Sequence, residues 1–260
     1  MDAADFLPFA HALADAARAE TVHRWHSGGA VDGKAGGLDF DPVTDADREG
    51  ERAMRALIDA RFPEHGIAGE EFPEKVGAGR WCWSLDPVDG TRSFICRLPM
   101  WVTLIALLDE GPPVLGIIDA PCLGERYAAA GGAGTMWSTA GEAPLRTSGC
   151  TNLAEARVST TDPYILGEGG AEAWERLRRA ARTSRYGLDG YGYARLAAGS
   201  LDLIVESGLK PHDYNALIPI VRAAGGFIGD WFGGEDFSAG RVVAAASHEL
   251  YDEAITLIGA

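Results

Sequence analysis

The chain has 260 residues, of which 47% are hydrophobic and 23% are charged. This composition is typical of a globular protein and excludes a chain that is mainly disordered. Lysine and arginine number 23 against 38 for aspartate and glutamate, so the formal net charge is −15. Because a chain this acidic repels nucleic-acid backbones and anionic membranes, we expect neither as a partner. A ligand that carries phosphate would need a recruited cation, for which a divalent metal is the obvious candidate.

Cysteine usage and the N-terminal residues indicate the compartment. The four cysteines are scattered and include no Cys-x-x-Cys pair, which argues against a disulfide framework. The chain starts with acidic residues, without the apolar core of a signal peptide, and no apolar run approaches the length of a membrane span. We therefore predict a cytoplasmic protein.

The first half of the chain predicts two helices and three strands. Apolar residues at helical spacing predict an amphipathic helix over residues 6–23. The Thr-x-x-Asp pattern at Thr44 is typical of a helix start and predicts a helix that ends at Pro63. Residues 27–37 are rich in glycine and predict a loop. Strands are expected at 81–85, 101–108 and 114–118, and the first should break off at the Asp-Pro pair that follows it.

The second half mixes helices and strands without a strict βαβ repeat. Apolar runs predict strands at 157–160, 201–205, 227–231 and 242–246. Helical spacing predicts helices at 171–182, 191–198, 213–224 and 248–258, the third closed by the Gly225-Gly226 pair. The sequence therefore predicts a layered α/β protein, while its strand order is open.

Acidic residues follow the ends of three predicted elements, and at two of these positions a structural role explains them. Glu70 and Glu71 come after a short apolar step, and a solvated turn is the commoner explanation for a lone pair of glutamates. Asp213 is at the start of a predicted helix, where an aspartate is usually a cap. The Thr44 pattern, which includes Asp47, equally fits a capping box without a catalytic role. These positions alone leave the function open.

The remaining cluster reads Asp86-Pro87-Val88-Asp89-Gly90-Thr91. It places two carboxylates three residues apart on a tight turn, where Pro87 fixes φ and Gly90 permits a close backbone approach. Two carboxylates about 4 Å apart repel by roughly 4 kcal/mol at an effective dielectric constant near 20 unless a proton or a cation lies between them. Hard oxygen ligands favour Mg²⁺, Ca²⁺ or Mn²⁺ over zinc. The amides of Gly90 and Thr91 begin a short predicted helix that suits an anion, so the segment predicts metal-assisted phosphate chemistry.

Together these motifs resemble the inositol monophosphatase superfamily of Mg²⁺-dependent, lithium-sensitive phosphatases. The resemblance rests on Gly69-Glu70-Glu71, on the 86–91 segment and on His212-Asp213 before a helix, and it extends from about residue 41 to residue 231. Within the superfamily the chain is most similar to the histidinol-phosphate phosphatase branch. That closer similarity rests on residues 40–48, 92–95, 185–189 and 208–213.

The resemblance implies a role for each matching residue. The metal ligands would be Glu70, Asp86, Asp89 and Asp213, with the carbonyl of Val88 as a further oxygen. The catalytic set would be Asp47, Thr91 and Glu70, of which Asp47 and Thr91 orient and activate the attacking water. The substrate-binding set would be Asp89, Gly90, Thr91, Arg92, Gly187, Asp189 and Glu206. In that set the amides of Gly90 and Thr91 hold the phosphate, while Asp189 and Glu206 face the rest of the substrate.

The resemblance also implies the fold and the assembly. We expect a layered α/β structure, the five-layered αβαβα sandwich of the inositol monophosphatase type, in a homodimer. Residues 1–260 would form one phosphatase unit with two approximate halves. Residues 1–150 carry the metal and phosphate motifs, and residues 151–260 carry the substrate-side residues and the last metal ligand.

The leading hypothesis is a Mg²⁺-dependent phosphomonoesterase, with Mn²⁺ as a substitute, that hydrolyses L-histidinol phosphate in histidine biosynthesis through a metal-activated water. The alternative of the same chemistry is a phosphatase of inositol 1-phosphate or another small sugar or polyol phosphate. Asp189 discriminates between them, because a carboxylate suits the ammonium of an amino alcohol and a polyol has no charge to pair. An alternative of a different class is a non-catalytic, metal-binding regulatory protein on the same fold, which predicts the loss of a ligand or of the water-activating pair. Serine or cysteine nucleophiles lack their motifs here.

Overall fold

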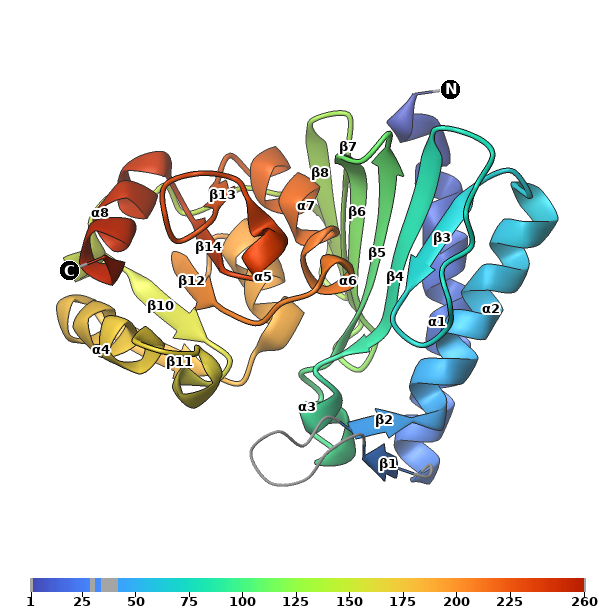
Figure 1. Ribbon diagram of the computed structural model, residues 1–260, viewed down its shortest axis with the longest axis horizontal. Coiled ribbons are helices and arrows are strands. Elements are labelled where there is room, and N and C mark those ends of the chain that lie inside the picture. The colour runs from blue at the N-terminus through green and yellow to red at the C-terminus, as the bar shows by residue number, and fades with distance from the viewer. Residues whose placement is uncertain (1, 29–30, 34–41, 260) are drawn as a thin grey trace.

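The computed structural model describes residues 2–28, 31–33 and 42–259 (Figure 1). Phe40 and Asp41, which belong to the family resemblance, lie outside the described residues, as does part of the predicted loop at 27–37. Within that predicted loop, β1 (Val31–Gly33) pairs antiparallel with β2 (Pro42–Thr44). The loop prediction is therefore wrong at β1, because the glycine-rich composition of this segment gives no strand signal.

The molecule is built in five layers that alternate helices with sheets (Figure 1). Its helices are α1 (Leu7–Ser27), α2 (Asp45–Arg61), α3 (Thr91–Ile95), α4 (Gly170–Ala180), α5 (Asp189–Ala197), α6 (Pro211–Tyr214), α7 (Leu217–Ala223) and α8 (His248–Ile258). The α1–α2 pair covers one face of a seven-stranded sheet, and α5, α6 and α7 lie between that sheet and a five-stranded one. The remaining pair, α4 and α8, covers the far face of the five-stranded sheet. The predicted five-layered αβαβα sandwich is confirmed.

The larger sheet comes from the first half of the chain. Its strands, in spatial order, are β3 (Gly66–Gly69), β4 (Trp81–Asp89), β5 (Val102–Asp109), β6 (Pro113–Ala120), β7 (Glu125–Ala130), β8 (Ala133–Ser138) and β9 (Gly141–Pro144). Only β3 and β4 pair parallel, and every other neighbouring pair is antiparallel. Both faces of the central strands are apolar because helices cover both, so their sequence reads as continuous hydrophobic runs.

The smaller sheet comes from the second half. Its spatial order is β11 (Thr183–Tyr186), β10 (Arg157–Thr160), β12 (Leu203–Glu206), β14 (Val242–Ala245) and β13 (Phe227–Gly229). The three strands β11, β10 and β12 run parallel, so their carboxyl ends meet at one edge of the sheet. That edge presents the segments that follow them, including Thr161 after β10 and Asp189 at the start of α5, together with Glu206 at the end of β12.

The predicted start of α2 is confirmed in detail. The Thr44 hydroxyl accepts a hydrogen bond from the Ala46 amide at 3.1 Å, and the Asp47 carboxylate accepts one from the Thr44 amide at 2.8 Å. This reciprocal capping box satisfies backbone donors that have no partner inside the helix. It also buries Asp47 almost completely at the helix N-terminus, where the helix dipole favours negative charge.

One strand extends beyond its predicted end. The prediction stops at Leu85, but β4 continues through Pro87 to Asp89. Its parallel neighbour β3 ends opposite Leu85, and the pairing with β5 shifts register between Asp86 and Asp89. Proline is tolerated at such an irregularity because no ladder partner needs its missing N–H. Both aspartates are therefore held on strand backbone rather than on a free loop.

One predicted helix is divided. The prediction has a single helix over residues 213–224, whereas α6 ends at Tyr214 and α7 starts at Leu217. In an uninterrupted helix, Pro219 would lie in the interior and remove a hydrogen bond to residue 215. The break places Pro219 in the first turn of α7, where its nitrogen needs no partner. The predicted glycine closure is confirmed, since the amides of Gly225 and Gly226 bond back to Arg222 and Val221.

Seven strands, β1, β2, β3, β7, β8, β9 and β11, have no counterpart in the prediction. Three of them, β7, β8 and β9, form a hairpin series rich in alanine and glycine, residue types that are rare in strands. β11 is a short edge strand that directly follows the helix predicted over 171–182. That helix, α4, ends at Ala180, two residues before its predicted end. None of the helices in the described part of the chain has the length and apolar run that crossing a bilayer requires.

A partly buried ion pair between Arg157 and Asp202 connects three segments of the chain. The Asp202 carboxylate, just before β12, accepts hydrogen bonds from Nε and Nη2 of Arg157, each at 2.7 Å, and from the Ser148 hydroxyl at 2.5 Å. These bonds lower the pKa of Asp202 below its ordinary value, although burial acts in the opposite direction.

Asp202→Asn is expected to lower the free energy of unfolding by about 1.5–3 kcal/mol, towards the low end because water partly solvates the Arg157 side chain. Since the folded-state pKa is depressed, the contribution of Asp202 is present above the unfolded-state pKa of about 3.9 and is lost as pH falls through the folded value. Urea unfolding of both proteins at pH 7 and at pH 3 measures this. If the free energies of unfolding of the wild type and Asp202→Asn differed by the same amount at both pH values, the prediction would be contradicted.

Candidate active site

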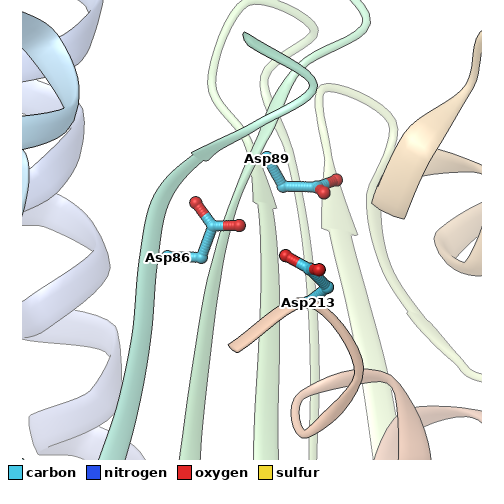
Figure 2. A group of neighbouring side chains, drawn as sticks. All are labelled: Asp86, Asp89 and Asp213. Atoms are coloured by element: carbon cyan, nitrogen blue, oxygen red, sulfur yellow. The ribbon is translucent and has the colours of Figure 1, made fainter. Parts of the chain in front are cut away.

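Three carboxylates converge where the larger sheet meets the middle layer of helices. Asp86 and Asp89 come from β4, and Asp213 comes from α6 (Figure 2). Each offers one oxygen that lies within 4.8 Å of the oxygens offered by the other two. Asp86 is fully buried, and the other two are half-buried. The residues are up to 127 positions apart in the chain (213 − 86), and the fold brings them together.

The position of Asp213 is fixed by contacts between α6, α7 and the larger sheet. Asn215 donates a side-chain hydrogen bond to the buried Ser84 hydroxyl on β4, at 3.2 Å. The bend between α6 and α7 rests on Gly116 of β6, where a Cβ would lie 2.2 Å from the Ala216 carbonyl oxygen. A larger residue at Gly116 would push the bend away from the sheet. Glycine here therefore supports the approach of Asp213 to the two aspartates of β4.

The electrostatics of the cluster fit a divalent cation. Burial, followed by the charge of Glu70, raises the pKa of Asp86 well above its ordinary value, and burial with the charge of Asp189 does the same for Asp89. Carboxylates that repel each other in a buried site are stabilised by a cation between them. Oxygen donors of this kind suit Mg²⁺, Mn²⁺ or Ca²⁺. The donor set therefore fits the predicted metal, and Asp86, Asp89 and Asp213 are the residues that would hold it.

Glu70 lies beside this group. Burial, and then the charge of Asp213, raises the pKa of Glu70 to about 8. His212 is next to both, with Nε2 at 4.0 Å from Glu70 Oε1 and 3.5 Å from Asp213 Oδ1. The fully buried Glu51 of α2 holds the adjoining turn, because its carboxylate accepts the Glu71 amide at 2.7 Å. The structure thus brings Glu70 to the cluster, and its role as a ligand stays a prediction.

Asp47 and Thr91, the two residues predicted to activate the water, flank the cluster. Among the described residues, no hydrogen bond joins these two side chains. Asp47 Oδ2 accepts both the amide and the hydroxyl of Thr44, the latter at 2.5 Å. Burial raises the pKa of Asp47 to about 6, although the bonds from Thr44 lower it. The Thr91 hydroxyl donates to the Val88 carbonyl at 3.1 Å. These contacts fit a structural role for Asp47 as well as a catalytic one. That Asp47 and Thr91 act on the same water stays a prediction.

The predicted phosphate turn has the backbone that its sequence suggested. Gly90 adopts φ 87°, in the left-handed region that favours glycine, and it precedes the first residue of α3, Thr91. Arg92 follows with about half of its side chain exposed, and its Nη1 lies 3.9 Å from Asp162 Oδ2. Since α3 has only five residues, its dipole adds little, and any hold on phosphate would come from individual amides and from the metal.

The substrate-side residues divide into two groups. Asp189 lies against the phosphate turn, since a Cβ built on Gly90 would be 3.0 Å from Asp189 Oδ2. Glu206 is buried at the end of β12, and burial raises its pKa to about 8. By contrast, Gly187 is exposed, and a Cβ built on it would meet nothing within 4 Å. The structure brings Asp189 and Glu206 to the site and places Gly187 at its outer rim.

Asp189 does not cap the helix that begins there. α5 begins at Asp189 itself, its N-cap is Leu188, and no side-chain hydrogen bond caps it. Asp189 instead has φ 47°, in the left-handed region that aspartate and asparagine tolerate better than most residues. Strained backbone of this kind is often kept at functional sites, where the surrounding structure holds it.

Three contributors to the site were not predicted from the sequence. The Gly190 amide donates to Asp89 Oδ2 at 2.5 Å, and a Cβ at Gly190 would lie 2.6 Å from that oxygen. Thr161 donates its amide to Glu206 Oε1 at 2.7 Å and accepts the Asp189 amide on its hydroxyl at 3.2 Å. Tyr193 lines a small pocket beside Asp89 and Asp213. These contacts join segments far apart in the chain, so no local sequence motif predicts them.

Comparison with known proteins identifies the family. The model of the inositol monophosphatase family matches residues 2–259. The chain belongs to this family. It is 40% identical over 228 residues to the chloroplastic bifunctional phosphatase IMPL2 of Arabidopsis thaliana, a match that covers 84% of this chain and 65% of that protein. It is 36% identical over 222 residues to a histidinol-phosphatase of Chlorobaculum parvum, with 85% of each chain covered. The solved structure of an inositol monophosphatase from Zymomonas mobilis is 36% identical, with a TM-score of 0.85 and 98% of both chains covered.

The predicted family and enzyme class are confirmed. The chain is a phosphoric monoester hydrolase of a metal-dependent family, and the alternative of a non-catalytic regulatory protein is set aside. The acidic cluster supplies a place for the metal. The choice of Mg²⁺, the homodimer, the cytoplasmic location and the division into halves at residue 150 stay predictions.

Proposed function

We propose that this enzyme hydrolyses L-histidinol phosphate to L-histidinol and phosphate, with Mg²⁺ as its cofactor and Mn²⁺ as a substitute. One observation carries the substrate: the Asp189 carboxylate lies against the Gly90 turn, beside the carboxylates proposed as metal ligands. Histidinol phosphate has its ammonium on the carbon next to the one that bears the phosphate ester. A phosphate held at the turn would therefore bring that ammonium within reach of a carboxylate.

The chemistry of the proposal divides between the metal and the chain. When bound by Asp86, Asp89 and Asp213, the metal supplies positive charge that offsets the phosphate and lowers the pKa of nearby water. The amides of Gly90 and Thr91 would orient the phosphate. The Thr91 hydroxyl, which donates a hydrogen bond to the Val88 carbonyl, keeps its lone pairs to accept a hydrogen bond from the attacking water and so to orient it.

The Asp189→Asn variant tests the substrate. Charge-assisted hydrogen bonds contribute roughly 1.5–3 kcal/mol, so we expect kcat/KM for histidinol phosphate to fall by about 10- to 100-fold. Inositol 1-phosphate, which has no ammonium, should lose little. Asparagine also tolerates the left-handed φ of this position, so the backbone should stay in place. Steady-state kinetics with both esters measures the difference.

A parallel fall with both esters, or no fall with histidinol phosphate, would remove Asp189 from substrate recognition. The circular dichroism spectrum and the Tm of the variant show whether a parallel fall reflects stability. Thr161→Ser is a matched control, because it keeps the hydroxyl that accepts the Asp189 amide and does not change the charge of the pocket.

The second candidate is a phosphatase of inositol phosphates, a hypothesis that the Zymomonas mobilis relative supports. Arg92 favours it. Burial raises the pKa of Asp189 to about 6, and the positive charge of Arg92 opposes that rise and stabilises the carboxylate. A carboxylate that has a cation of its own requires none from the substrate. Phosphate release from histidinol phosphate, inositol 1-phosphate, fructose 1,6-bisphosphate and adenosine 3′,5′-bisphosphate decides between the candidates. A kcat/KM that is highest for inositol 1-phosphate would overturn our proposal.

A further inference from the structure

A small pocket lies among the carboxylates of the active site. Its polar walls are Asp89, Asp189, Glu206 and Asp213, and the hydroxyl-bearing residues Thr161 and Tyr193 also line it. The space open to the centre of a water molecule is about 20 Å³. One water needs roughly 10–15 Å³ by this measure and two to four polar partners. The pocket therefore has room for one water and is too small for a substrate.

Most polar walls of this pocket are tied to the backbone. Asp89 accepts the Gly190 amide, and Glu206 accepts the Thr161 amide. The Thr161 hydroxyl in turn accepts the Asp189 amide. The first two bonds fix the carboxylates of Asp89 and Glu206 in place, and each of these carboxylates retains further lone pairs that can accept a donor from inside the pocket.

Tyr193 is the exception among the walls. It projects from α5, its side chain is almost fully buried, and its ring packs in the apolar core between the two sheets. Within the described part of the chain, no protein atom forms a hydrogen bond with its buried hydroxyl. The charges that act on this hydroxyl are those of Glu206, Asp89 and Asp213, all members of the pocket wall. Buried tyrosine hydroxyls usually have a partner, so a phenol unpaired by protein in a water-sized pocket points to solvent.

We propose that the Tyr193 hydroxyl holds one buried water that bridges to Asp89 and Glu206, and that this bridge positions Asp89 for the metal. Tyr193 is then a positioning residue, which acts on the metal through a carboxylate that it does not touch. Groups that orient a metal ligand typically change metal affinity by about 10- to 100-fold when they are removed. The inference rests on the proposed role of Asp89 as a ligand.

The alternative is that Tyr193 only fills the core. The two explanations predict opposite effects of Tyr193→Phe, which removes the hydroxyl and keeps the ring. If the hydroxyl were idle, phenylalanine would relieve an unpaired polar group, raise the Tm and leave metal binding unchanged. If the hydroxyl holds the bridging water, the variant should bind metal more weakly without a gain in the Tm of the metal-free protein.

The experiment measures Mn²⁺ binding directly, by electron paramagnetic resonance of the free ion, together with the Tm of the metal-free protein. We expect the Kd of Tyr193→Phe for Mn²⁺ to rise about 10-fold or more. KM for the phosphate ester at saturating metal should stay unchanged. Tyr191→Phe is the matched control on the same helix, because its hydroxyl donates to Glu125 at 3.0 Å, outside the pocket. The control should keep the wild-type Kd for Mn²⁺.

Two results would overturn the inference: an unchanged Kd with a higher Tm in Tyr193→Phe, or a high-resolution crystal structure with no water density in the pocket. Asp89→Asn separates this failure from failure of the proposed function. If Asp89→Asn abolishes Mn²⁺ binding while Tyr193→Phe leaves it unchanged, the metal site stands and only the bridging water is wrong.

Discussion

Asp89→Asn is expected to reduce turnover by about 10³-fold or more while the protein stays folded, since charge stabilisation by a metal is worth several kcal/mol in the transition state. Asparagine keeps the shape of the side chain and can still accept the Gly190 amide, but it removes one negative charge from the cluster of Asp86, Asp89 and Asp213. A smaller total charge binds a divalent cation more weakly. The measurement is kcat over a range of Mg²⁺ concentrations, with Mn²⁺ binding as a second readout.

The same loss should follow metal removal. Excess EDTA should bring the wild-type enzyme to the level of Asp89→Asn, and excess Mg²⁺ should restore the wild type alone. Asp202→Asn is a useful control, because it also removes one carboxylate charge from a buried position but lies in the ion pair with Arg157, away from the cluster. Full turnover of Asp89→Asn, or of the wild type in EDTA, would contradict the metal mechanism.

The acidic motifs could be predicted from the sequence because each has a local cause. The 86–91 segment combines two carboxylates, a proline and a glycine within six residues, and its backbone adopts the left-handed turn at Gly90 that this combination suggests. The capping box at Thr44 is local in the same sense, since its bonds join residues two and three positions apart. The family resemblance then added what spacing alone could not, namely that these segments meet.

The rest of the site depends on contacts between distant segments. The bond from Gly190 to Asp89 spans 101 residues, and the bond from Thr161 to Glu206 spans 45. In the sequence, Tyr193 is one aromatic residue on the apolar face of a predicted helix. Only its burial beside the carboxylates of the pocket indicates a role for its hydroxyl. The break between α6 and α7 had a local cause in Pro219, but the apolar periodicity around it favoured one continuous helix.

Thr91→Ala is expected to lower kcat by about 10²-fold or more, the scale for loss of a contact to the attacking water in general-base catalysis, while Mn²⁺ affinity stays nearly constant. The hydroxyl bonds to the Val88 carbonyl, so alanine frees that carbonyl without removing a carboxylate ligand. Thr91→Ser is the matched control, because it keeps the hydroxyl and should keep most of kcat. A Thr91→Ala enzyme with normal kcat would show that another group positions the water.

Variants of Asp47 test whether Asp47 and Thr91 act on the same water. Its carboxylate is already bonded to Thr44 through Oδ2, so Asp47→Asn alone could act through stability of α2 rather than through catalysis. If Asp47 and Thr91 act on one water, their effects on kcat should be strongly non-additive: once either is lost, removing the other costs little more. If Asp47 is only a cap, the double variant should show the full Thr91→Ala loss in kcat and a separate fall in Tm. Kinetics and thermal unfolding of the two single variants and the double variant therefore assign Asp47 to the water or to the helix.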